Sequence, residues 1–179
     1  MLQTIRNLAL GLAIGMAVLP VASATTPLSG PEIMAAEKVR KQIVKLPFYS
    51  IFDHITFQLD DGVVTLGGEV YRPSLRKSAE RVAMRVEGVS SVVNNIEILP
   101  NSFFDDRIRL SVARTIFSSP VLNRYGIQSV PPIHVIVRNG DVILEGVVNR
   151  EMERNVAGIL ANGVSGVFSV TNNLRLDSR

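Results

Sequence analysis

An internal repeat constrains this chain more than any other feature of its sequence. Residues 55–98 align without a gap to residues 133–176 at a constant offset of 78, and 17 of the 44 aligned positions are identical. Self-similarity at a fixed offset indicates that one supersecondary unit has been duplicated. The sequence therefore predicts two copies of one module, which we place at residues 31–100 and 101–179.

Each copy contains the pattern of a β-hairpin. Residues 55–59 alternate apolar and polar side chains, as a strand with one buried face requires. Asp61-Gly62 and Asn139-Gly140 follow at equivalent positions, and both dipeptides favour the left-handed backbone of a type I′ turn. The inward face of the returning strand is expected to hold Val64, Leu66, Gly68 and Val70 in the first copy and Val142, Leu144, Gly146 and Val148 in the second. We attribute the two inward glycines to the close approach of a helix to the sheet.

Helical patterns flank each hairpin. The stripe Leu75, Ala79 and Ala83 follows the first hairpin, and Met152, Val156 and Leu160 belong to its counterpart, for which Asn149 is the expected N-cap. Gly88 and Gly166 are suited to ending these helices, and a third strand is expected at 91–99 and at 169–176. With another helical pattern before each hairpin, the predicted fold class is α+β. It comprises two tandem αββαβ modules, each a three-stranded mixed sheet covered on one face by two helices.

The first 24 residues have the pattern of a cleaved export signal. Arg6 precedes an uncharged run at 8–19, and Ala22-Ser23-Ala24 matches the small-x-small pattern of signal peptidase sites. A run of 12 residues spans about 18 Å as a helix, which is short of the roughly 30 Å of a bilayer core. The chain has no Cys, so an oxidising compartment would impose no disulfide on it. We therefore predict a periplasmic protein.

The repeated motifs resemble a known family. The segments DGVVTLGGEV (61–70) and EGVSSVVNNI (87–96) resemble the BON domain, and NGDVILEGVV (139–148) with SGVFSVTNNL (165–174) looks like a second copy. The layout is similar to that of the OsmY-like periplasmic proteins of Gram-negative bacteria. The resemblance implies a non-catalytic module that binds phospholipid surfaces or client proteins during envelope or osmotic stress. It also implies that the signature glycines are structural: Gly62, Gly68, Gly88, Gly140, Gly146 and Gly166.

A basic and aromatic segment in the second copy is the candidate lipid-binding site. Phe103 and Phe104 precede a helical pattern rich in arginine, and a longer loop with further candidates follows it. The complete set is Phe103, Phe104, Arg107, Arg109, Arg114, Arg124 and Tyr125. Arginines attract anionic headgroups and a phenylalanine ring can insert among them, so the pattern predicts a peripheral contact with anionic phospholipid. The alternative is that the charged faces are solvated and the phenylalanines pack between domains.

A second candidate surface is the outward row of the second hairpin, which is apolar where the first copy is polar. Ile136, Ile143 and Val147 form this row, and they predict a contact with the first copy or with another protein. Such a surface is typical of a periplasmic chaperone or an assembly adaptor for envelope proteins.

Enzymatic and metal chemistry find little support in the sequence. The only histidines are His54 and His134; His134 aligns with Thr56, so the two are not a repeated ligand. No Gly-x-Ser-x-Gly motif, thiol or closely spaced histidine pair is present. We therefore predict no catalytic residues, no metal site and no cofactor. A net charge of +3 gives no strong indication of nucleic-acid binding.

Overall fold

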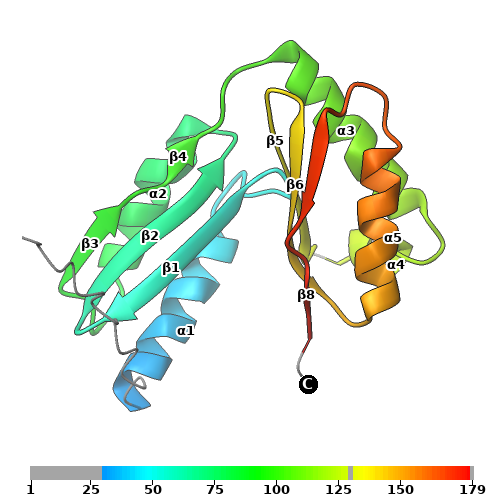
Figure 1. Ribbon diagram of the computed structural model, residues 1–179. Coiled ribbons are helices and arrows are strands. Elements are labelled where there is room, and N and C mark those ends of the chain that lie inside the picture. The colour runs from blue at the N-terminus through cyan, green and yellow to red at the C-terminus, as the bar shows by residue number, and fades with distance from the viewer. Residues whose placement is uncertain (1–29, 129–130, 178–179) are drawn as a thin grey trace, which may run out of the picture.

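The computed structural model describes residues 30–128 and 131–177, so the predicted signal at residues 1–24 lies outside the described residues. Each half of the chain forms a sheet with helices packed on one face (Figure 1). The first module comprises α1 (Gly30–Val44), β1 (His54–Asp60), β2 (Val63–Val70), α2 (Pro73–Met84), β3 (Ser91–Asn94) and β4 (Glu97–Ile98). The second comprises α3 (Phe103–Ser118), α4 (Asn123–Gly126), β5 (Ile133–Arg138), β6 (Asp141–Val148), α5 (Glu151–Asn162), β7 (Ser169–Asn172) and β8 (Arg175–Leu176). The predicted α+β class with two tandem modules is confirmed.

Both sheets are mixed and share one topology. β2 pairs antiparallel with β1 and parallel with β3 and β4, and β6 pairs in the same way with β5, β7 and β8. The sequence predicted one continuous third strand in each module. The structure instead has two short strands there, β3 and β4 in the first module and β7 and β8 in the second. Asn94 causes the break in the first module, because its Oδ1 accepts the N–H of Ile96 at 3.2 Å. β3 ends at this local turn, and Ile96 lies in the core, where it is 1% exposed.

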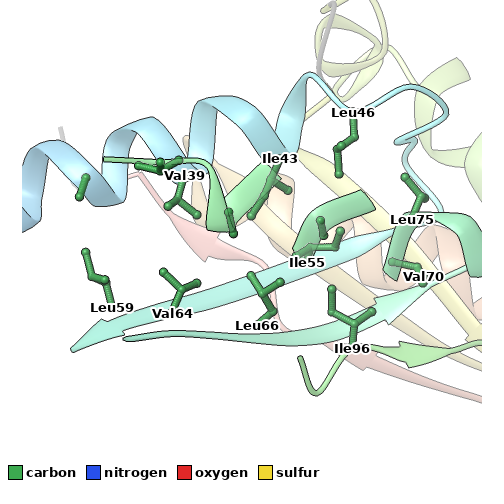
Figure 2. Close-up of a cluster of buried hydrophobic side chains, with 14 residues drawn as sticks. Val39, Ile43, Leu46, Ile55, Leu59, Val64, Leu66, Val70, Leu75 and Ile96 are labelled. Carbon is green, nitrogen blue, oxygen red and sulfur yellow. The ribbon is translucent and has the colours of Figure 1, made fainter. Parts of the chain in front are cut away.

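The core of each module lies between its helices and the inward row of its hairpin. In the first module, Val39 and Ile43 of α1 point toward Val64 and Leu66 of β2 (Figure 2). The second core repeats this arrangement: Val142, Leu144 and Val148 of β6 pack with Ala157 and Ala161 of α5, which are fully buried. The inward rows predicted for both hairpins are therefore confirmed.

Two pairs of equivalent glycines, one in the hairpin turns and one in the returning strands, have different physical roles. Gly62 and Gly140 adopt φ of 75° and 86° in the hairpin turns, as the predicted turn type requires. The predicted reason for Gly68 and Gly146, a helix close to the sheet, is wrong: backbone atoms of the neighbouring strand segment, and not of a helix, lie close to both glycines. A Cβ on Gly146 would lie 1.8 Å from the carbonyl oxygen of Pro132, and one on Gly68 would lie 2.0 Å from that of His54. The backbone at the start of the neighbouring antiparallel strand therefore excludes a side chain at both positions.

The helix ends also differ from the predicted ones. The N-cap of α5 is Arg150 rather than Asn149, and Glu153 accepts the backbone N–H of both residues at 3.0 and 3.2 Å. A glutamate at the third helical position can reach back in this way, so the capping group comes from within the helix. Gly88 and Gly166 do not end their helices. Each lies four residues beyond the last residue of its helix, in the turn that leads to β3 or β7.

The two modules are joined by direct contacts as well as by the chain. The N–H of Val135 in β5 donates to the carbonyl of Ile51 at 2.7 Å, so the segment before β1 pairs with the edge of the second sheet. The hydroxyl of Tyr71 lies 3.1 Å from a carboxylate oxygen of Asp106 in α3. Phe52 of the first module also packs against the second core. The modules thus share polar and apolar contacts.

Candidate functional site

The exposed aromatic residues of the second module gather at one of its ends. Phe103 and Phe104 are each 73% exposed, and their rings meet edge to face with centroids 6.3 Å apart. Phe168 is 85% exposed and lies just before β7, which begins at the same end of the module as α3 (Figure 1). Its N–H donates to the carbonyl of Gly140 at 2.9 Å, which fixes it against the hairpin turn. We call these three residues the phenylalanine tip.

The exposed face of α3 continues from this tip. Residues spaced by four, three and four positions lie on one side of a helix. On α3 these are Phe103, Arg107, Leu110 and Arg114, and all four are exposed. Apolar and cationic side chains therefore alternate along one helical face. Neither arginine makes an ion pair within the described part of the chain.

A buried carboxylate holds the tip in place. Ser102 caps α3, because its Oγ accepts the N–H of Asp105 at 3.2 Å. Asp105 is 1% exposed, and its two oxygens accept the N–H groups of Asn139 at 3.0 Å and of Gly140 at 2.9 Å. The first turn of α3 is thus tied to the hairpin turn, and the phenylalanines project from a fixed platform.

Arg109 does not belong to this surface, contrary to the sequence-based interpretation. Its side chain is 2% exposed and pairs with Asp106, and it donates to the carbonyl of Val137 at 2.7 Å. Its guanidinium lies 4.9 Å from the centroid of the Tyr71 ring in the first module. Arg109 therefore joins the two modules and cannot reach a membrane.

Arg124 and Tyr125 also serve the fold. Glu153 occupies the position that the buried Leu75 has in the first copy, and it is 3% exposed. The Tyr125 hydroxyl donates to Glu153 at 2.8 Å, and Arg124 pairs with the same carboxylate. Burial raises the pKa of Glu153, but these two partners and the helix N–H groups outweigh it and leave that pKa lowered. The longer loop of the second copy thus compensates for a charge in its core.

The apolar row on the second hairpin is largely covered. Ile136 is 1% exposed, and Ile143 and Val147 are half-buried. The neighbouring Val135 pairs with the segment before β1, so the first module lies along this edge. A chaperone surface centred on Ile136 is therefore not accessible, and the remaining hypothesis for a client site rests on Ile143 and Val147.

The two histidines lie next to each other where the modules meet. The alignment of the two copies in the sequence did not predict this contact. The ring centroids of His54 and His134 are 5.7 Å apart, and Tyr49 lies 5.8 Å from His134. Burial lowers the pKa of both rings; His54 further lowers that of His134, whereas Glu145 and Glu69 oppose the shift at His54. Self-alignment could not detect this pair, because it compares equivalent positions and not contacts between copies.

The described residues contain no group of three or more histidine, aspartate or glutamate side chains arranged to hold a metal ion. Within the same residues, no helix combines the length and apolar character needed to cross a membrane.

The fold defines a protein of two tandem modules of one αββαβ type, with an exposed aromatic and cationic helix face on the second. The chain belongs to the BON domain family: the family model matches residues 34–100 and 105–178. BON domains are phospholipid-binding domains related to the cell envelope.

Similar proteins add little to this assignment. The chain is 29% identical over 140 residues to an uncharacterized protein in the gshII 5′ region of Anaplasma centrale, covering 78% of this chain and 90% of that protein. Two structures of CdsD, a structural protein of the type III secretion system of Chlamydia trachomatis, are 12% identical to it. They cover 79% and 80% of this chain, and 96% and 93% of their own chains, with TM-scores of 0.27. Scores this low support no functional inference.

Proposed function

We propose that this protein is an exported, non-catalytic double-BON protein that binds anionic phospholipid surfaces of the cell envelope and protects the envelope under stress. One observation carries the proposal: apolar and cationic side chains alternate on the exposed face of α3, beginning at Phe103 and Phe104. The predicted signal at residues 1–24 supports a periplasmic location. The contact is peripheral, because the residues that carry it lie on the surface of a folded module.

The expected strength of this contact follows from the exposed residues. Burying one phenylalanine side chain contributes about 1.5–3 kcal/mol, and an arginine near an anionic surface contributes about 1 kcal/mol. Phe103 and Phe104 with Arg107 and Arg114 thus supply about 5–8 kcal/mol. This corresponds to dissociation constants of roughly 1–200 μM. The cationic part is screened by salt, so binding weakens as ionic strength rises.

Co-sedimentation with vesicles tests the proposal. We expect recovery with vesicles containing phosphatidylglycerol, little recovery with pure phosphatidylcholine, and a decrease between 50 and 300 mM salt. Phe103→Ser with Phe104→Ser should strongly weaken binding at both salt concentrations. Arg107→Gln with Arg114→Gln should reduce the preference for the anionic lipid and leave the apolar contact of the phenylalanines.

The first module offers a matched control. Ile33 and Met34 lie near the start of α1 and are 53% and 63% exposed, so they are an apolar pair on the corresponding helix. Ile33→Ser with Met34→Ser should leave vesicle binding unchanged. Equal recovery with neutral and anionic vesicles, unaffected by salt or by either pair of α3 substitutions, would contradict the proposal.

A further inference from the structure

The internal repeat provides a natural comparison for the helix that follows each hairpin. α2 and α5 bury equivalent alanines, and Ala79, Ala83, Ala157 and Ala161 are all fully buried. Their exposed faces differ. Lys77, Arg81 and Arg85 are exposed at intervals of four along and just beyond α2, whereas α5 has Asn155, Ile159 and Gly163 at the equivalent positions. The module folds without these cations, so packing does not account for them.

The three cations form a stripe whose members have no ion-pair partner. None of them makes an ion pair among residues 30–128 and 131–177. The adjacent Glu80 keeps its negative charge, but its carboxylate accepts the side-chain amide of Asn94 at 2.9 Å and makes no ion pair with the stripe. Other exposed cations do find partners: Lys41 pairs with Glu37 at 3.3 Å, and Arg154 of α5 pairs with Glu151 at 3.0 Å. We call Lys77, Arg81 and Arg85 the basic stripe.

The stripe borders an open hollow with an apolar component. Its three cations and Glu80 surround a space of about 570 Å³ together with Met84, which is 51% exposed, and Val92. Consecutive members of the stripe are about 6 Å apart along the axis, because each residue of a helix rises 1.5 Å. A ligand in this hollow would meet several positive charges at once and an apolar surface beside them.

We infer that the basic stripe of α2 is a second site for anionic phospholipid headgroups, separate from the face of α3. The stripe supplies the charge that attracts the phosphate, and Met84 and Val92 contact the glycerol and first methylene groups. This inference rests on the proposed function, since it assigns the same ligand class to a second surface on the other module. An acidic peptide would also meet the charges. The hollow is open and lies mainly along a single helix, so it offers a peptide few enclosing contacts but is accessible to a lipid surface.

Amide chemical shifts of the ¹⁵N-labelled protein test this directly. Dihexanoylphosphatidylglycerol, added below its critical micelle concentration, should shift the amides of residues 77–85 and of Val92. The same concentration of dihexanoylphosphatidylcholine, of inorganic phosphate or of a polyglutamate peptide should shift them much less. Lys77→Gln with Arg81→Gln and Arg85→Gln should abolish these shifts, because the variant lacks the charges that attract the phosphate.

Two controls use the protein's own surface. Arg40→Gln with Lys45→Gln and Arg154→Gln removes the same charge elsewhere and should leave the shifts at α2 unchanged. Asn155→Lys with Ile159→Arg and Gly163→Arg transfers the stripe to α5 and should create new shifts there. The space at Gly163 permits this, because its φ is −79° and a Cβ would have only ordinary contacts at 3.7 Å.

The outcomes separate this inference from the proposed function. Shifts confined to Phe103–Arg114 would overturn the second site and leave the α3 contact standing. Shifts at α2 alone would support the second site and contradict the α3 contact. A response at α2 to polyglutamate or phosphate that equals the response to the lipid would overturn the assignment to phospholipid, as would equal shifts in the stripe variant and its charge-matched control.

Discussion

Replacing Asp105 by alanine should destabilise the second module more than a change at any exposed carboxylate. The side chain is 1% exposed and accepts two backbone N–H groups of the hairpin turn, at 3.0 and 2.9 Å. Hydrogen bonds to a charged group contribute about 1.5–3 kcal/mol each. Water can replace the carboxylate at the exposed Asn139 but not at the buried Gly140. We therefore expect Asp105→Ala to cost about 3–4 kcal/mol, a large part of the 5–15 kcal/mol typical of a domain.

Urea unfolding followed by far-UV circular dichroism measures this loss. With a denaturant dependence of about 2 kcal/mol per molar urea, the transition of the second module should shift by roughly 1.5–2 M. Hydrogen exchange of residues 133–148 should accelerate, while that of residues 54–70 should not. Asp60→Ala at the exposed end of β1 is the matched control and should change stability by no more than about 0.5 kcal/mol. Indistinguishable midpoints for the two variants would refute the assigned role of Asp105.

Three further perturbations test other contacts. Because burial lowers the pKa values of His54 and His134, protonation opposes the folded contact; stability should be complete above about pH 6.5 and decrease below it. His54→Gln with His134→Gln should flatten this decrease in urea midpoints measured from pH 7.5 to 5.5. Gly146→Ala places a Cβ 1.8 Å from a carbonyl oxygen at φ of 124°, so we expect a loss of at least about 3 kcal/mol in thermal unfolding, against little change for Gly163→Ala. Glu153→Ala leaves the Tyr125 hydroxyl and the backbone N–H groups at the start of α5 without an acceptor, so it should lower the free energy of unfolding in urea by about 2–4 kcal/mol. Glu153→Leu tests whether leucine, the residue at this position in the first copy, can replace the glutamate.

The regular part of the fold follows directly from the sequence. Alternation with period two, two turn dipeptides and two helical stripes repeat at one offset, so each copy supports the interpretation of the other. The division of the third strand could not be predicted in this way. It depends on the side chain of Asn94, which bonds to the backbone of Ile96 and of Arg76. A hydrophobic pattern contains no information about such bonds.

The candidate site was predicted only in part, for a related reason. Phe103 is exposed and Arg109 is buried because one face of α3 faces the solvent and another faces Tyr71 of the first module. A helical wheel separates the two faces but does not show that a second module covers one of them. Arg109 and Arg107 have the same chemistry in the sequence, and only the contact between modules distinguishes them.

Duplication explains how one protein can carry two different surfaces on one architecture. The inward positions are shared, as Leu66 and Leu144 show, because each sheet must be covered by its helices. The outward positions are free to diverge, and they have diverged in opposite ways. The first module has placed unpaired cations on α2, whereas the second has placed aromatic and cationic residues on α3 and none of the stripe on α5. Exchanging the exposed residues of α2 and α5, with both cores unchanged, should therefore move the lipid response of α2 to α5 without loss of stability and leave that of α3 unchanged. A protein that unfolds on this exchange would show that the cations serve packing after all.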